Sequence, residues 1–361
     1  MSVPSLLLAT RYGRLGASSR QRLLLYRGAL EEAGFRVDVI SCLDDAYLRA
    51  LYEGRPHRAA AVAAYARYLP RLVAPRRHDL VWIEKELLPY LPAALERLVL
   101  GRTPYVLDFD DAWFLRYAQH RSRLVRWLLG GKFPALLRGA ALVVVANATL
   151  RAWAEANGAR RVLELPTVVD LDLYPPTPEP AGPFTVAWIG TPMTMAYLAA
   201  IVPALQALAR TGPLRLLVIG APGFAIAGVE CVHAPWSEAE EAALIARAHV
   251  GVMPLPDEAW ARGKSAYKLI QYMAAGRAVV ASPVGANRSV VRDGETGFLA
   301  ADEAGWIDAL ARLRAEPALR ARFGAAGRAR VAAEYARQAT APRLIAALAE
   351  AGGFDRAPGG R

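Results

Sequence analysis

The sequence contains few of the residues that build disulfide frameworks and metal centres. Among its 361 residues are only two cysteines, Cys42 and Cys231, which lie far apart without metal-ligand spacing. Neither has a second sulfur or a histidine pair beside it. We therefore expect both thiols to be reduced and buried, with no structural disulfide and no metal site.

Long apolar runs are absent as well. No stretch reaches the roughly 18 residues that a transmembrane helix needs, and the apolar start at residues 5–9 is too short for a signal-peptide core. We therefore expect a cytoplasmic protein. Hydrophobic residues make up 54% of the chain and charged residues 21%, which excludes a disordered chain. The length suits two domains.

Lysine is the scarcest charged residue. Four lysines stand against 40 arginines and 33 acidic residues, which gives a net charge of +11. This balance suits nucleic acid, an anionic membrane or a phosphate-bearing substrate. The sequence lacks helix-turn-helix, zinc and RNP-like signatures, and arginine replaces lysine throughout. A nucleic-acid-binding protein is therefore the disfavoured alternative, and we expect no nucleic-acid partner.

Positive charge gathers in one segment of the first half. Between residues 112 and 154 there is no acidic residue. The basic residues are Arg116, Arg121, Arg123, Arg126, Lys132, Arg138 and Arg151, and they are interleaved with Trp113, Phe114, Tyr117, Trp127 and Phe133. The stretch 113–138 resembles a membrane-surface helix. Two interpretations stay open: docking on an anionic membrane near a lipid-linked acceptor, and a basic helix packed in the first domain with its charge toward solvent.

Short apolar runs alternate with longer helix-periodic stretches, which indicates an α/β protein with parallel sheets. The predicted strands are residues 5–10, 36–41, 80–84, 105–108 and 142–146 in the first half, and 185–189, 214–219, 250–254 and 278–282 in the second. A proline-rich stretch at 175–183 predicts a stiff linker between domains at 1–174 and 184–335. We expect two Rossmann-like doubly wound domains facing a ligand cleft, with a C-terminal helix and tail at 336–361 that crosses back to the first domain.

Two of the four lysines fall together in the second half. Lys264 and Lys268 are four residues apart, so on a helix they share a face, where like charges repel. A bound anion would remove this repulsion, and two ammonium groups with a helix N-terminus neutralise a diphosphate. The alternative is a pair of solvated surface lysines. Because lysine is so scarce in this chain, we favour a phosphate site.

Segment 262–291 resembles the nucleotide-sugar half of a GT-B glycosyltransferase, in the broad retaining group related to glycosyltransferase family 4. The matching parts are the helix KLIQYMAAG, the strand AVVAS and the turn PVGANRSVV. Supporting segments are FTVAWIGTPMTMAYL (184–198), RLLVIGAPG (215–223), LPTVVDLDLY (165–174) and TRYGRLGASSRQRLLLY (10–26). Together they follow the order of the family over most of the chain.

The resemblance implies transfer of a sugar from a UDP- or GDP-type nucleoside-diphosphate sugar to an acceptor hydroxyl, with retention and without metal or cofactor. The acceptor, which the resemblance assigns to the first domain, is a saccharide, a lipid-linked sugar or a small molecule. Family members carry two glutamates with seven residues between them, at positions where this chain has Gly263 and Gln271. Gln271 is still expected to bond the donor ribose, and Asp257, Glu258 and Lys264 remain open as substitutes for the first glutamate.

Further donor contacts are expected in loops that follow predicted strands. The turn residues Ser282, Val284, Gly285 and Asn287 bring backbone amides to a sugar or phosphate, or form an ordinary strand–helix turn. The loop residues Gly190, Thr191 and Thr194 are expected at the diphosphate. Trp236 lies in the base-binding loop, where it either stacks on the base or packs in the core.

The first domain offers two polar loops. One contains Gly13, Gly16, Ser18, Ser19 and Arg20, which approach the leaving phosphate or form a plain connection; the spacing is not a dinucleotide fingerprint. The other contains Asp108, Asp110 and Asp111, whose D-x-D pattern is typical of metal-dependent transferases with one compact domain. We favour acceptor binding or helix N-capping for these carboxylates. Glu84, Lys85 and Glu86 are weaker acceptor candidates.

We predict that Lys264 and Lys268 are catalytic, because charge builds on the departing diphosphate. A retaining reaction needs no protein base, whereas an inverting one would use Asp110, Asp111 or His120. A nucleotide-sugar epimerase or hydrolase on the same fold is the alternative enzyme.

Overall fold

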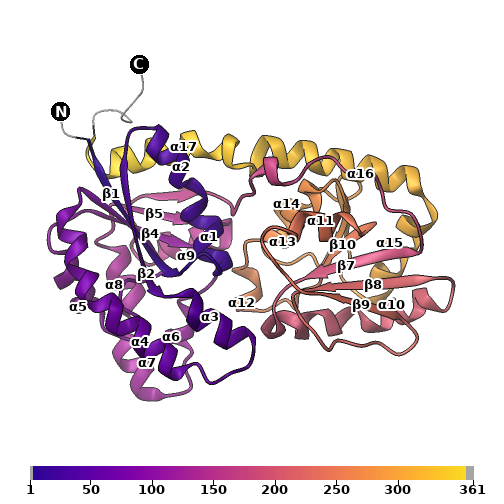
Figure 1. Cartoon of the computed structure of the whole chain (residues 1–361), viewed down its shortest axis with the longest axis horizontal. Coiled ribbons are helices and arrows are strands. Elements are labelled where there is room, and N and C mark those ends of the chain that lie inside the picture. The colour runs from indigo at the N-terminus through magenta and orange to yellow at the C-terminus, as the bar shows by residue number, and fades with distance from the viewer. Residues whose placement is uncertain (1–2, 355–361) are drawn as a thin grey trace. The chain divides into compact units, whose positions relative to one another are not determined.

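The computed structural model describes residues 3–354, which divide into two compact α/β units (Figure 1). Unit 1 contains the chain up to Thr167 together with the residues from Thr340 onward, and unit 2 is Val168–Ala339. Each unit has its own parallel sheet, so the prediction of two doubly wound domains is confirmed.

Unit 1 is built on a six-stranded sheet in the order β2-β1-β3-β4-β5-β6. The strands are β1 (Ser5–Tyr12), β2 (Arg36–Leu43), β3 (Leu80–Glu84), β4 (Tyr105–Phe109), β5 (Leu142–Val145) and β6 (Val162–Glu164). The helices are α1 (Ala17–Arg22), η1 (Leu24–Tyr26), α2 (Arg27–Glu32), α3 (Asp45–Tyr52), α4 (Arg58–Tyr68), η2 (Leu69–Arg77), α5 (Ala93–Leu100), α6 (Leu115–Ala118), α7 (Arg123–Leu129), α8 (Lys132–Leu137) and α9 (Ala148–Ala156). Strands β3, β4 and β5 are buried at every residue, as in parallel sheets covered on both faces.

Unit 2 has a second six-stranded parallel sheet in the order β12-β11-β10-β7-β8-β9. The strands are β7 (Phe184–Ile189), β8 (Leu214–Ile219), β9 (Glu230–Ala234), β10 (Val250–Met253), β11 (Ala278–Ala281) and β12 (Gly297–Leu299). The helices are η3 (Leu171–Leu173), η4 (Pro192–Ile201), α10 (Val202–Ala209), α11 (Glu241–Ala246), α12 (Ala259–Arg262), α13 (Tyr267–Ala274), α14 (Asn287–Val290), α15 (Glu303–Ala315), α16 (Pro317–Arg330), η5 (Val331–Tyr335) and α17 (Arg337–Ala351). The order places β7, the first strand of the unit, next to β10, so a topological switch point lies between them.

The boundary between the units differs from the predicted one. Residues 168–174 belong to unit 2, where Val169 forms a bridge with Ala336 and Tyr174 is buried against Glu241. The proline-rich stretch is also anchored in unit 2, because Arg277 donates to the carbonyls of Thr177 and Pro178. Side-chain contacts that the local sequence does not reveal therefore hold the predicted linker.

Helix α17 begins in unit 2 and continues into unit 1, which contains its residues from Thr340 onward. Within unit 1 the hydroxyl groups of Tyr26 and Thr340 lie 2.7 Å apart, and Leu344 and Leu348 are fully buried. The last turns of the chain are therefore part of the core of unit 1.

Two expectations about apolar groups need correction. Cys42 is buried, which raises the pKa of its thiol to about 12, but Cys231 lies on the edge strand β9 and is only half-buried.

The helical stretch Pro192–Ala209 is long and apolar enough to cross a membrane by length and composition alone. Leu198, Leu205 and Leu208 of this stretch instead pack in the core of unit 2.

Candidate functional site

Lys268 is the central side chain at the carboxyl ends of the strands of unit 2. It lies in the first turn of α13, and its Nζ sits 4.1 Å from the centre of the Trp188 ring. A Cβ at residue 190 would lie 2.8 Å from this Nζ and 2.5 Å from the Trp188 ring. Gly190 is therefore required by the close approach of the ammonium group to the end of β7.

The electrostatics of Lys268 favour an anion. Burial, reinforced by the charge of Lys264, lowers the pKa of Lys268 to about 7. Within residues 3–354 no carboxylate forms an ion pair with Lys268. A desolvated ammonium without a negative partner is unfavourable, so binding of an anion would stabilise it.

Lys264 also lies at this edge of unit 2, but its place in the secondary structure differs from the predicted one. It lies in the loop between α12 and α13, so the two lysines do not share a helix. The left-handed residue Ala266, at φ 55°, separates Lys264 from the helix start. The Nζ of Lys264 lies 5.5 Å from the centre of the Tyr197 ring, and its charge still reaches Lys268.

The residues that could substitute for the first glutamate of the family have different surroundings in the structure. Asp257 is exposed and forms an ion pair with Arg262 at 2.6 Å. Glu258 precedes α12 and raises the pKa of Tyr197, secondary to the burial of that phenol. Tyr197 therefore lies against Lys264 and also experiences the charge of Glu258.

The turn after β11 uses its side chains to hold itself in place. Ser282 Oγ accepts a hydrogen bond from the amide of Leu255 at 3.0 Å, and Asn287 Nδ2 donates to the carbonyl of Ser282 at 2.9 Å. Val284 is buried. Gly285 has φ 52°, and a Cβ there would lie 2.5 Å from the carbonyl oxygen of Arg262. The turn therefore offers a ligand its backbone rather than its side chains.

The threonines after β7 form a cap. The amide of Thr191 donates to Thr194 Oγ1 at 3.2 Å, and the Thr194 hydroxyl donates back to the carbonyl of Thr191 at 3.1 Å. This reciprocal arrangement begins η4 directly after Gly190. Both threonines position the loop beside Lys268.

Glu241 is a buried residue of this unit that the sequence analysis did not identify. Its carboxylate accepts from the Trp236 indole N–H and from the Tyr174 hydroxyl, each at 2.6 Å. Gln271 is 3% exposed, and its Nε2 donates to the same hydroxyl at 3.4 Å. Trp236 is thus fixed by a hydrogen bond, and Gln271 joins it through a shared network. The only local signal, an acidic residue at the start of a helix, is too common to single out Glu241.

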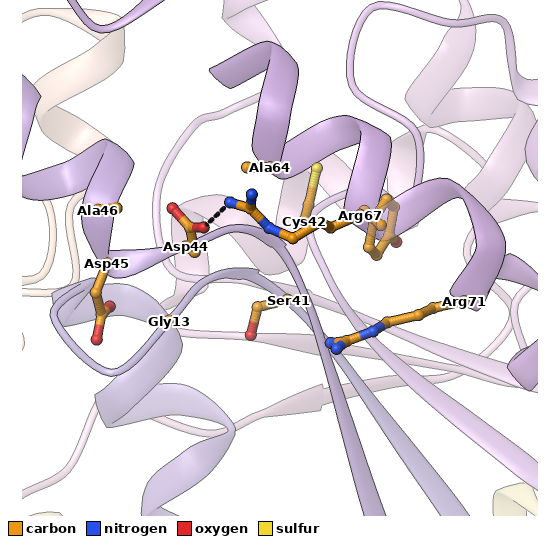
Figure 2. Close-up of a pocket in the computed structure, with 10 residues that line it drawn as sticks. Gly13, Ser41, Cys42, Asp44, Asp45, Ala46, Ala64, Arg67 and Arg71 are labelled. Atoms are coloured by element: carbon orange, nitrogen blue, oxygen red, sulfur yellow. Dashed lines mark hydrogen bonds and ion pairs between the residues drawn. The ribbon is translucent and has the colours of Figure 1, made fainter. Parts of the chain in front are cut away.

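The glycine-rich loop of unit 1 follows β1. The amide of Leu15 donates to Asp45 Oδ1 at 3.0 Å, and a Cβ at Gly13 would lie 2.4 Å from that oxygen. A Cβ at Gly16 would lie equally close to the Cβ of Tyr12. A cavity of about 450 Å³ adjoins this loop, with Ser41, Arg67 and Arg71 among its lining residues (Figure 2).

The serines after this loop connect it to β3. Ser19 Oγ donates to Glu84 Oε2 at 2.5 Å and accepts from the amide of Tyr12 at 3.0 Å. Ser18 Oγ accepts from Lys85 Nζ at 3.0 Å. Arg20 is buried and donates to the carbonyl of Arg14 at 2.9 Å. These side chains fix the loop against the carboxyl ends of β1 and β3.

The three aspartates at the end of β4 have different roles. Asp108 is fully buried and accepts from Arg22 at 2.8 and 3.1 Å, so it is an internal ion pair and not an acceptor ligand. Asp110 Oδ1 lies 3.0 Å from Lys85 Nζ, and Asp111 lies 4.0 Å from it. These carboxylates raise the pKa of Lys85 against the effect of burial. Neither caps a helix, because α6 begins only at Leu115.

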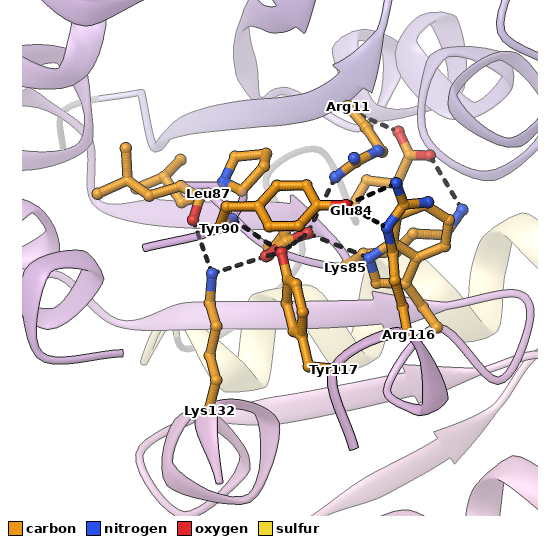
Figure 3. Close-up of polar contacts among 12 residues, drawn as sticks. Arg11, Glu84, Lys85, Leu87, Tyr90, Arg116, Tyr117 and Lys132 are labelled. Carbon is orange, nitrogen blue, oxygen red and sulfur yellow. Dashed lines mark hydrogen bonds and ion pairs between the residues drawn. The ribbon is translucent and has the colours of Figure 1, made fainter. Parts of the chain in front are cut away.

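Glu86 is the centre of a buried polar network (Figure 3). Its carboxylate accepts from Lys132 at 2.6 Å, Arg11 at 3.0 Å and Tyr117 at 2.9 Å. Lys132 also reaches Glu96 at 2.7 Å. Although burial raises it, these cations hold the pKa of Glu86 below its ordinary value. The network stabilises the segment after β3 and places Lys132 inside the protein, not on a basic surface.

No group of His, Cys, Asp and Glu side chains suited to a metal ion occurs in the described part of the chain. Residues 184–316 match the family model for glycosyl transferases group 1. Within unit 2 the chain is therefore similar to glycosyl transferases group 1, and its two-sheet fold is of the GT-B type. None of the curated proteins compared with this chain matches it.

Solved structures share the fold of this chain at low sequence identity. Anabaena HepE in complex with UDP and glucose is 15% identical with a TM-score of 0.71, and the alignment covers 96% of this chain and 100% of that chain. Sucrose-phosphate synthase from Thermosynechococcus elongatus is 17% identical with a TM-score of 0.67, covering 94% and 97%. A glycosyltransferase from Rickettsia africae is 14% identical with a TM-score of 0.63, covering 97% and 99%.

Proposed function

We propose that the enzyme transfers a sugar from a nucleoside-diphosphate sugar of the UDP or GDP type to an acceptor hydroxyl, with retention at the anomeric carbon. The observation that carries the proposal is Lys268, an ammonium group desolvated at the carboxyl edge of unit 2 without a carboxylate partner. Structural neighbours solved with UDP or UDP-glucose support a donor of the UDP type.

The reaction breaks the bond between the anomeric carbon and the diphosphate and forms a bond from that carbon to the acceptor oxygen. The acceptor attacks from the side of the leaving group, and its proton passes to a phosphate oxygen. Negative charge on the diphosphate grows as the bond breaks, so Lys268 and Lys264 stabilise the transition state more than the ground state. The two ammonium groups supply positive charge that a metal ion provides in other transferases.

In this proposal, unit 1 binds the acceptor. Asp110 and Asp111 follow β4 at the carboxyl edge of the sheet, and Lys85 holds Asp110 in its ionised form. An ionised carboxylate at this edge accepts a hydrogen bond from an acceptor hydroxyl. The acceptor classes that fit are a saccharide, a lipid-linked sugar and a small alcohol, and a lipid-linked acceptor would require the enzyme to work at a membrane.

The first experiment removes the central ammonium group. Lys268→Ala should lower kcat by about 100-fold or more, because one preorganised charge at the leaving group is worth several kcal/mol. Nucleotide release from UDP- and GDP-sugars is measured with and without a panel of acceptors. Arg247→Ala, which removes an exposed cation of the same unit, serves as the control and should retain activity. Full turnover by Lys268→Ala would reject the proposal.

The acceptor panel also tests the alternative enzyme class. A transferase releases nucleotide only when an acceptor is present, whereas a hydrolase releases it without one. An epimerase changes the sugar and releases no nucleotide. Rapid acceptor-independent release by the wild type would therefore replace the transferase proposal with a hydrolase.

A further inference from the structure

Helix α7 of unit 1 exposes its large apolar side chains to solvent. Trp127 is 80% exposed, Leu124 66% and Leu128 48%. Their spacing of three and four residues places all three on one face of the helix. Figure 1 shows α7 beside α6 in the part of unit 1 drawn in purple. Single apolar side chains are common on protein surfaces, but three large ones on one face of a helix indicate an interaction surface.

The other aromatic residues of the stretch 113–138 are packed in the protein. Trp113, Tyr117 and Phe133 are buried, and Phe114 stacks on Trp153 with ring centres 3.7 Å apart. Of the five aromatic residues in this stretch, Trp127 is the one presented to solvent. The sequence left membrane docking and packing open for the whole range, whereas the structure restricts the exposed apolar face to α7.

The charged residues of the segment that contains this face have one sign. Arg121 and Arg123 are exposed at the start of α7, and no acidic residue occurs between residues 112 and 154. Arg126 donates to the carbonyls of His120 and Arg121, so it holds the start of the helix. An apolar face bordered by unpaired positive charge is complementary to an anionic lipid surface.

We propose that α7 docks the enzyme on an anionic membrane. Trp127, Leu124 and Leu128 enter the boundary between headgroups and acyl chains, while Arg121 and Arg123 contact lipid phosphates. A tryptophan suits this boundary because its ring is apolar and its N–H is polar. This inference goes beyond sugar transfer, since the surface lies on α7 and uses none of the residues assigned to the donor or the acceptor.

Vesicle sedimentation of the full-length protein tests the proposal. We expect binding to phosphatidylcholine vesicles that contain about a third phosphatidylglycerol, and at least tenfold weaker binding to phosphatidylcholine alone. The variant Leu124→Ser, Trp127→Ala, Leu128→Ser should lose binding by tenfold or more, and Arg121→Ser with Arg123→Ser should weaken it similarly. Leu98→Ser removes a leucine of α5 that is 65% exposed, and this control should bind as the wild type does.

Three outcomes would overturn the proposal. They are absence of wild-type binding to the anionic vesicles at low salt, equal binding by the α7 variant, and equal loss of binding by Leu98→Ser. A lipid-free dimer that disappears in Trp127→Ala would instead assign the face to a second copy of the chain. Thermal unfolding verifies that each variant is folded, and soluble-acceptor transfer measured in parallel keeps this result separate from that of the proposed function.

Discussion

Lys268 combines an unfavourable environment with a functional position. Its ammonium group is desolvated and close to Lys264, and it lies against the Trp188 ring. Cation–π contact compensates for part of the lost hydration but supplies no negative charge. In the described part of the chain no carboxylate pairs with this ammonium group, and under the proposed function the diphosphate of the donor supplies the negative charge.

The pKa of Lys268 predicts how nucleotide binding depends on pH. A diphosphate binds the ammonium form, and above pH 7 the unliganded site is mostly neutral, so binding takes up a proton. UDP affinity should therefore fall as pH rises from about 7 to 9, above the range in which phosphate itself titrates. Calorimetry in two buffers of different ionisation enthalpy measures the proton uptake. Lys268→Met should abolish both the slope and the uptake, and an unchanged slope would contradict the assignment.

Gly190, in the loop after β7, leaves the space that the Lys268 ammonium group occupies. At Gly190 a methyl group would occupy space that the Lys268 ammonium and the Trp188 ring now share. Gly190→Ala should therefore weaken UDP binding by about tenfold or more, because the ammonium must move from its position. Gly28→Ala in α2, where a Cβ meets nothing within 4 Å, is the matched control. Equal UDP affinity in both variants would show that the close approach is unimportant.

The segment after β3 depends on its buried ion network. Glu86→Ala removes the carboxylate that Arg11 contacts and leaves Lys132 with Glu96, and removal of one partner of a buried pair costs about 3–5 kcal/mol. Urea unfolding should show a loss of this size. Glu31→Ala breaks the exposed pair with Arg27 and should change the unfolding free energy by less than about 1 kcal/mol. A small effect for Glu86→Ala would indicate that water enters the network.

At the scale of the whole molecule, the chain returns to unit 1 after forming unit 2. Leu344 and Leu348 of α17 are fully buried there. Replacing both by Ala should remove about 2–5 kcal/mol each from the stability of unit 1. Hydrogen exchange should then increase in β1 and β3 and stay unchanged in β7 and β10. Arg343→Ala, on the exposed side of α17, is the control, and equal acceleration in both units would contradict this division.

Edge strands and domain boundaries were the parts of the fold that local pattern did not reveal. The three-residue strands β6 and β12 were not predicted, because so short a segment carries almost no alternation. Strand β9 was missed because its residues are half exposed. Likewise, Arg277 and Arg320 hold the proline-rich stretch from nearly 100 residues or more away in sequence. Contacts of that range leave no mark on the local composition.

The sequence by itself determined the two-sheet α/β architecture and led to the prediction that the lysine pair binds phosphate. Apolar periodicity is a local property, and the scarcity of lysine made Lys264 and Lys268 conspicuous. Only the tertiary structure decided which polar groups neutralise one another. Among the residues that the structure describes, it pairs Asp108 with Arg22 and places no carboxylate against Lys268, because pairing depends on distances between residues that are remote in the chain. The same reason explains why Trp127 is exposed while its aromatic neighbours are buried.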